Sequence, residues 1–113
     1  MIRLHALHAV AWTALRALPP LRAKWLVDRL GRALPTLSPE EARRAAVALE
    51  VAGTCLSRAL TIAACVPGSE VVIAADPSRP RRRGSWSAHA WVEIDGVAVA
   101  SKDEAARVIA RLR

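Results

Sequence analysis

Two side chains in this sequence, Cys55 and His89, are of types that can do covalent chemistry together. A thiol attacks a carbonyl as its thiolate, and an ordinary cysteine pKa of about 8.5 leaves it mostly protonated at neutral pH. Cys55 follows Thr54, a typical helix N-cap, so backbone N–H groups and the positive end of the helix dipole favour a thiolate there. An imidazole such as that of His89 can take the thiol proton and return it to a leaving amine. The pair therefore predicts nucleophilic acyl-transfer chemistry.

Each of these residues also has an ordinary structural interpretation. A cysteine such as Cys55 often serves as a small buried hydrophobe, and His89 would suit a hydrogen-bonded position near a sheet edge. Cys65, at the far end of the same predicted helix, is assigned to packing. His5 and His8 have no acidic residue or cysteine near them in the sequence, so they are given no role in the site.

A third residue would have to hold the imidazole in the correct tautomer. Asp95 is roughly 20 Å along the strand from His89, so it is assigned to an Asp-Gly turn. A two-residue loop at Asp95-Gly96 would place Lys102 opposite His89, whereas a three-residue loop or a bulge would place Asp103 there. Asp103 is therefore the candidate orienting residue. It would equally suit the acidic first turn of a terminal helix.

The spacing of apolar residues predicts the helices that must position these groups. The pair Pro19-Pro20, a Ser-Pro-Glu-Glu start, Thr54 and Pro67-Gly68 divide the N-terminal part into helices over 2–18, about 21–34, 39–52 and 55–66. The second helix is expected to bury Leu26, Leu30 and Leu34. Both of the first two helices are basic and amphipathic, so they would either pack on the core or dock on a partner or an anionic membrane surface.

From residue 71 the pattern changes from helical to extended. A β-branched run predicts a short strand over 71–75, and residues 78–86 are too rich in arginine and chain breakers to pack inside. Two hairpin strands, about 87–94 and 97–101, flank the Asp-Gly turn, and a last helix is expected over about 103–112. The predicted fold is α+β, with a helical N-terminal half followed by a small antiparallel sheet.

Length and composition set further limits. The 113 residues predict a single domain over 1–113, with an N-terminal helical region over 1–36 and a core over 37–113. The net charge of +7 suits an acidic peptide, a nucleic acid or an anionic membrane surface. No ligand spacing predicts a metal, and no cofactor is expected. With neither a signal peptide nor a membrane span predicted, we expect reduced thiols and a cytoplasmic protein.

Two segments carry a resemblance to a known family: 54–60, which reads Thr-Cys-Leu-Ser-Arg-Ala-Leu, and 88–96, which reads Ala-His-Ala-Trp-Val-Glu-Ile-Asp-Gly. Over roughly residues 50–102 the chain resembles the leader peptidase of lasso peptide biosynthesis, the transglutaminase-like B protein in its split form. The resemblance implies a transglutaminase-like or papain-like cysteine protease core with Cys55 as nucleophile and His89 as base. The family's aspartate would fall near Ser101, so Asp103 takes that role only after a two-residue slip.

The resemblance implies a hydrolase that removes the leader from a ribosomally made lasso precursor peptide. Its partners would be the precursor, a separate small leader-binding protein and an ATP-dependent macrolactam cyclase, with no nucleic acid. The helical N-terminal half or the arginine-rich segment 79–83 would meet the leader-binding protein or an acidic part of the precursor, unless that segment is simply solvated. Peripheral membrane contact of residues 1–34 stays open.

The alternative is a non-catalytic basic binding module for a peptide, nucleic acid or membrane surface. Trp86 and Trp91 near a basic surface could hold nucleic acid, in which case affinity would fall steeply with salt. The order of Cys55 before His89, from a helix start to a strand, favours the enzyme.

Overall fold

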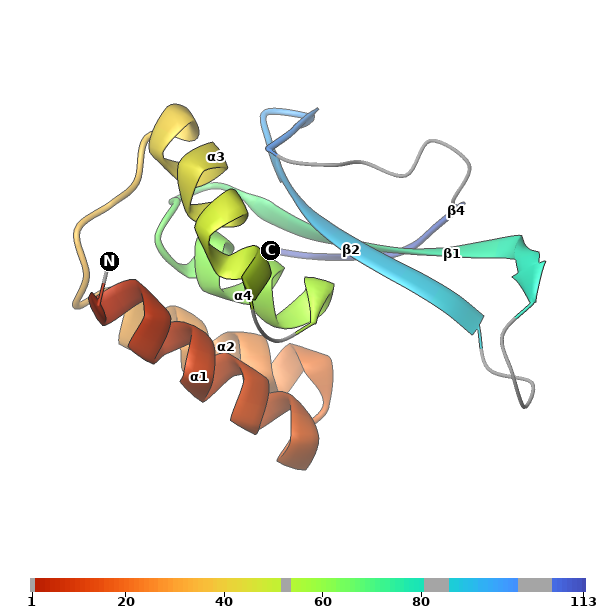
Figure 1. Ribbon diagram of the computed structural model, residues 1–113, viewed down its shortest axis with the longest axis horizontal. Coiled ribbons are helices and arrows are strands. Elements are labelled where there is room, and N and C mark those ends of the chain that lie inside the picture. Colours follow the sequence, from red (N-terminus) through yellow and green to blue (C-terminus); the bar gives the residue numbers. More distant parts are fainter. Residues whose placement is uncertain (1, 52–53, 81–85, 100–106) are drawn as a thin grey trace.

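The computed structural model describes residues 2–51, 54–80, 86–99 and 107–113. Helical segments come first, followed by strands of a single antiparallel sheet (Figure 1). The helical segments are α1 (Ile2–Ala17), α2 (Pro20–Gly31), α3 (Pro39–Ala48), η1 (Leu49–Val51) and α4 (Cys55–Ala64). The strands are β1 (Glu70–Pro80), β2 (Trp86–Ile94), β3 (Val97–Ala98) and β4 (Arg107–Leu112). The predicted α+β fold, with helices before a small antiparallel sheet, is confirmed.

Hydrogen bonds between neighbouring residues fix where the helices begin. At the start of α3, Ser38 Oγ accepts a hydrogen bond from Glu41 N–H at 3.1 Å, and Glu41 Oε1 accepts one from Ser38 N–H at 3.1 Å. This reciprocal capping box satisfies donors that have no partner inside the helix. The helix predicted to reach residue 52 instead passes at Leu49 into the 3-10 turn η1.

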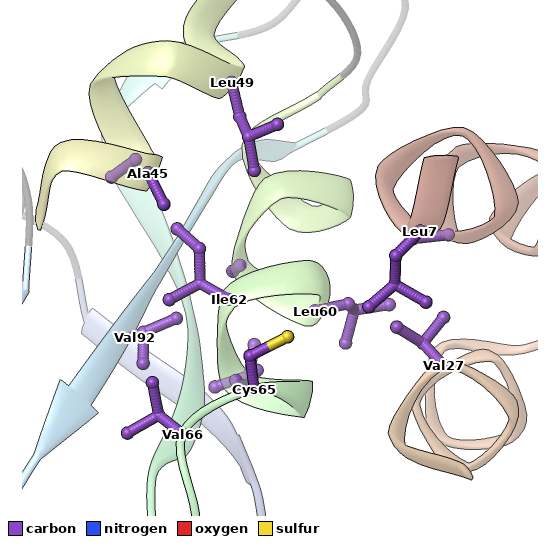
Figure 2. Close-up of a cluster of buried hydrophobic side chains, with 14 of the residues drawn as sticks. Leu7, Val27, Ala45, Leu49, Leu60, Ile62, Cys65, Val66 and Val92 are labelled. Atoms are coloured by element: carbon purple, nitrogen blue, oxygen red, sulfur yellow. The ribbon is translucent and has the colours of Figure 1, made fainter. Parts of the chain in front are cut away.

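The helix α4 lies at the centre of the molecule. In Figure 1, α1 and α2 lie on one side of α4, and the sheet lies on the other. Figure 2 shows Leu60 directed toward Leu7 of α1 and Val27 of α2, while Ile62 points toward Val92 of β2. A helix that is apolar on most of its circumference is stable only when covered in this way.

The second helix buries only part of the predicted face: Leu26 and Leu34 are partly buried against the core, but Leu30 is not. Ala23, Val27 and Gly31 are buried, whereas Leu30 is 45% exposed. The small side chains allow α2 to approach α4 closely, and a Cβ on Gly31 would lie 2.6 Å from Ala64 Cβ. The prediction for Leu30 was therefore wrong because close packing of helix backbones, rather than the size of the apolar side chains, selected the buried face.

Lys24 is also buried, although its type predicts exposure. Its Nζ lies 2.6 Å from Asp28 Oδ2, one turn further along α2. An ammonium group tolerates burial when a carboxylate neutralises it in this way. None of the helices in the described ranges is both long and apolar enough to cross a bilayer.

The sheet has the strand order β3-β2-β1-β4, and its hairpin turn is tight. Ile94 pairs with Val97 across a two-residue loop, with φ of 52° at Asp95 and 79° at Gly96. Positive φ at both loop residues is typical of a type I′ turn, which Asp-Gly favours. The predicted hairpin is confirmed with the two-residue loop rather than the three-residue loop.

Two other predictions for the C-terminal half were wrong. The strand β1 continues beyond Asp76 to Pro80, with a shift of register before Pro80 pairs with Trp86. Residues 107–112 of the predicted last helix form β4, which pairs antiparallel with β1. Ile109, which a terminal helix would have buried, is 65% exposed. The open backbone edge of β1 and the β-branched pair Val108-Ile109 favour a strand there.

Candidate functional site

Cys55 is the first residue of α4, as the sequence predicts, and it is half-buried. Thr54 is the N-cap: its Oγ1 accepts Ser57 N–H at 3.1 Å, and Ser57 Oγ accepts Thr54 N–H at 2.9 Å. The first intrahelical bond runs from Arg58 N–H to Thr54 O at 3.1 Å. The N–H groups of Cys55 and Leu56 therefore precede the helical ladder and point from the positive end of the helix dipole.

His89 lies on β2, opposite Ala74 of β1. Its imidazole is next to the indole of Trp91, with ring centroids 5.6 Å apart and planes tilted by 38°. Residues two apart on a strand share a face, so this ring contact fixes the direction of the His89 side chain.

The faces of β2 differ in what they contact. Ala90 and Val92 belong to the hydrophobic cluster around α4, whereas Trp91 packs with Val72 and Ala74 of β1 in a second cluster. The His89 side chain therefore leaves β2 on the Trp91 face, and Cys55 approaches β2 from the other face. Because side chains alternate between the two faces of a strand, the His89 side chain and Cys55 lie on opposite faces of β2. The order of the two residues in the sequence did not indicate this.

Cys55 and His89 nevertheless both line a cavity of about 50 Å³. Residues 89–92 of β2 contribute to its lining, together with residues of α3, η1 and α4. Along one edge of β2, β3 pairs with Glu93 and Ile94, and Val99 N–H donates to Val92 O at 2.9 Å. The candidate site is therefore a small cavity between β2 and the start of α4.

Two charged residues that the sequence analysis did not single out also line this cavity. Arg58 follows Cys55 by one helical turn, and Glu50 comes from η1. The sequence could have predicted that Arg58 lies near Cys55, because residues three apart share a helix face. Glu50 had no such signal, since its position depends on the turn that precedes α4.

The third predicted site residue, Asp103, lies outside the described residues, as does Ser101. Asp103 would lie opposite His89 only with a three-residue loop or a bulge. The observed register, with Glu93 opposite Ala98, corresponds to the two-residue loop. The three-residue loop offered for Asp103 is thus absent.

His8, which received no role from the sequence, reaches the first turn of α4. Its side chain is buried, and Nε2 lies 2.8 Å from Ser57 Oγ. Burial, with smaller contributions from the positive charges of Arg58 and His5, lowers the pKa of His8 below its ordinary value. The spacing of His8 could have predicted its burial. His8 follows Leu4 by four residues and precedes Ala11 by three, so it lies on the stripe that α1 buries.

On the face of β2 that carries His89 and Trp91, hydrogen bonds and ion pairs hold the Trp91 side chain in place. Trp91 Nε1–H donates to the buried Glu93 Oε2 at 2.9 Å, and Arg111 of β4 donates to Glu93 Oε1 at 2.9 Å. Arg111 also lies 3.4 Å from Glu70 of β1. The hydrogen bond to Glu93 and, to a smaller extent, the one to Glu70 raise the pKa of the Arg111 guanidinium. Trp91, which lines the cavity, is held by this network and cannot swing freely.

Cys65 packs in the core, as predicted, with 2% of its surface exposed. Burial raises the pKa of its thiol, which disfavours the thiolate. Within the described ranges, no cluster of three or more His, Cys, Asp or Glu side chains has the arrangement of a metal site.

No protein family model, curated protein or solved structure matches this chain. The fold and the geometry of the cavity are therefore the observations on which a function must be argued.

Proposed function

We propose that the protein is a cysteine peptidase in which Cys55 is the nucleophile and His89 is the base. One observation carries the proposal: Cys55 at the start of α4 and His89 of β2 line the same cavity. A half-buried thiol at a helix start has the access and the local dipoles that a nucleophilic cysteine needs. The buried Cys65 has neither.

In the proposed reaction, Cys55 Sγ attacks the scissile carbonyl carbon while His89 takes the thiol proton. The N–H groups of Cys55 and Leu56 stabilise the oxyanion of the tetrahedral intermediate. When the C–N bond breaks, His89 gives its proton to the leaving amine and a thioester remains on Cys55. Water, deprotonated by His89, then hydrolyses the thioester and regenerates the thiol.

This chemistry requires the His89 imidazole to come within hydrogen-bond reach of Cys55 Sγ. Because the His89 side chain lies on the Trp91 face of β2, the proposal needs this side chain to rotate around the edge of the strand toward α4. Catalytic hydrogen bonds often tighten only when substrate is bound. The ring contact with Trp91 would be exchanged for one with the thiol.

We further propose a substrate class from the sequence resemblance of segments 54–60 and 88–96. The substrate would be the leader–core junction of a lasso precursor peptide, presented by a separate leader-binding protein before macrolactam formation by the cyclase. The core of the chain would then be transglutaminase-like. A reducing cytoplasm suits this activity, because it keeps Cys55 as a thiol.

The test combines the protein with its precursor and leader-binding protein and follows the products by mass spectrometry. Wild type is expected to release the leader, whereas Cys55→Ala and His89→Ala are expected to be inactive or nearly so. Cys65→Ala is the matched control, since it removes the buried thiol and should keep cleavage. Undiminished cleavage by Cys55→Ala would end the proposal.

A further inference from the structure

A contact between distant parts of the chain supports the turn that carries Cys55. His8 of α1 is only 6% exposed, and its Nε2 atom lies 2.8 Å from Ser57 Oγ. Ser57 closes the capping box with Thr54, and Cys55 lies between these two residues. The helix start is thus tied to α1 as well as to its own N-cap.

The number of hydrogen bonds that the Ser57 hydroxyl can donate and accept shows whether His8 is a donor or an acceptor. Ser57 Oγ accepts Thr54 N–H at 2.9 Å and also lies 2.9 Å from Thr54 O. A hydroxyl has one proton to donate and two lone pairs to accept with. All three contacts of Ser57 are hydrogen bonds at once only if the hydroxyl donates to Thr54 O and His8 Nε2–H donates to Ser57 Oγ.

We propose that His8 is a positioning residue that holds the nucleophile-bearing turn at the start of α4 by donating a hydrogen bond to Ser57. This role rests on the proposed function of Cys55. The bond from His8 fixes the Ser57 hydroxyl toward Thr54 O, which leaves its remaining lone pair for Thr54 N–H. Residues 54–57 are thereby held from both ends, so the thiol and the adjacent N–H groups keep a constant orientation toward the cavity.

The experiment compares three substitutions of His8 in the full chain. Gln keeps an N–H donor at a reach similar to that of Nε2, Asn is polar but too short, and Leu removes the donor. His5→Leu is the matched control, because His5 lies one turn earlier on α1 and is exposed. Amide hydrogen exchange of Thr54 and Ser57 reports the capping box directly, with Leu60 as the reference amide on the same helix.

His8→Leu and His8→Asn are expected to speed exchange at Thr54 and Ser57 by about tenfold relative to Leu60, the scale of one lost hydrogen bond. His8→Gln and His5→Leu should match wild type. Unchanged exchange, an equal rise at Leu60, or failure of Gln to restore protection would overturn the role of His8. Should the Leu variant not fold, the comparison of Asn with Gln decides in the same way.

Leader cleavage adds the functional readout. The Asn variant is expected to lower kcat about tenfold with KM unchanged, because it alters the reacting group rather than the binding surface. Gln should restore kcat, and a rise in KM alone would contradict positioning. Exchange needs no substrate, so cleavage that persists in Cys55→Ala would refute the peptidase while the exchange result still decides what His8 does.

Discussion

Gly31→Ala tests whether the close approach of α2 and α4 is real. A Cβ at this position would lie 2.6 Å from Ala64 Cβ, 2.8 Å from Ala64 O and 3.0 Å from Ala64 C. Two of these neighbours are backbone atoms of the helix that carries Cys55. They cannot move aside as a flexible side chain would, so the added methyl group must push the helices apart.

The magnitude follows from two opposing effects. Forcing an extra methyl group into a packed interface costs about 1 to 3 kcal/mol. Alanine is better than glycine inside a helix by about 1 kcal/mol, but Gly31 is the last residue of α2 and gains less. The net expectation is a loss of about 1 to 2 kcal/mol, which corresponds to a fall of roughly 5 to 10 °C in Tm for a domain of this size.

Urea unfolding followed by circular dichroism measures the effect, and a double-mutant cycle with Ala64→Gly locates it. The second substitution removes the shortest contact but keeps the one to Ala64 O. The double variant should therefore be more stable than the sum of the single losses by about 1 kcal/mol. A neutral or stabilising Gly31→Ala, or strict additivity in the cycle, would refute the packing of α2 on α4 described above.

Asp28→Ala is expected to cost about 3 kcal/mol because it leaves the buried ammonium of Lys24 unpaired. Lys24→Met should lower the free energy of unfolding by less, since the Asp28 side chain is 30% exposed against 5% for Lys24. Equal losses for the two variants in urea unfolding would count against this. The free energy of unfolding should also fall as the pH drops below the ordinary histidine pKa of about 6.5. The reason is that the pKa of His8 is lowered in the folded state, so the unfolded state binds the proton first. Burial, Arg58 and His5 all oppose that charge, and His8→Gln should flatten this part of the pH profile; a profile unchanged in the Gln variant would show that His8 is not its source.

Local signals in the sequence predicted the helix starts and the hairpin. The Ser38 box, the Thr54 cap and the Asp95-Gly96 turn each depend on residues that contact one another within a few positions. Such interactions do not depend on distant parts of the chain, so they can be predicted from the neighbouring residues alone. The placement of Cys55 at a helix start follows from the same kind of evidence.

What could not be predicted depends on distant partners. The terminal segment has both helical and strand character, and the open edge of β1 decides in favour of β4. Lys24 lies on the same buried side of α2 as Val27 and Gly31, and Gly31 packs against α4. The role of His8 depends on Ser57, 49 residues away, even though its position on the buried stripe of α1 was readable.

The candidate site divides in the same manner. The residue types and order of Cys55 and His89 could be read from the sequence, but the direction of His89 from β2 required the pairing of that strand. The assignments of Asp103 and of a leader peptide substrate stay predictions, as does the alternative of a non-catalytic basic binding module.

The rate at which iodoacetamide alkylates Cys55 at neutral pH, read by peptide mass spectrometry, tests most directly whether the two side chains act together. If His89 activates the thiol at the shared cavity, His89→Ala should slow alkylation by about tenfold, and the buried Cys65 should stay largely unlabelled in both proteins. An equal rate of Cys55 alkylation in wild type and His89→Ala would contradict the pairing of this thiol with this histidine.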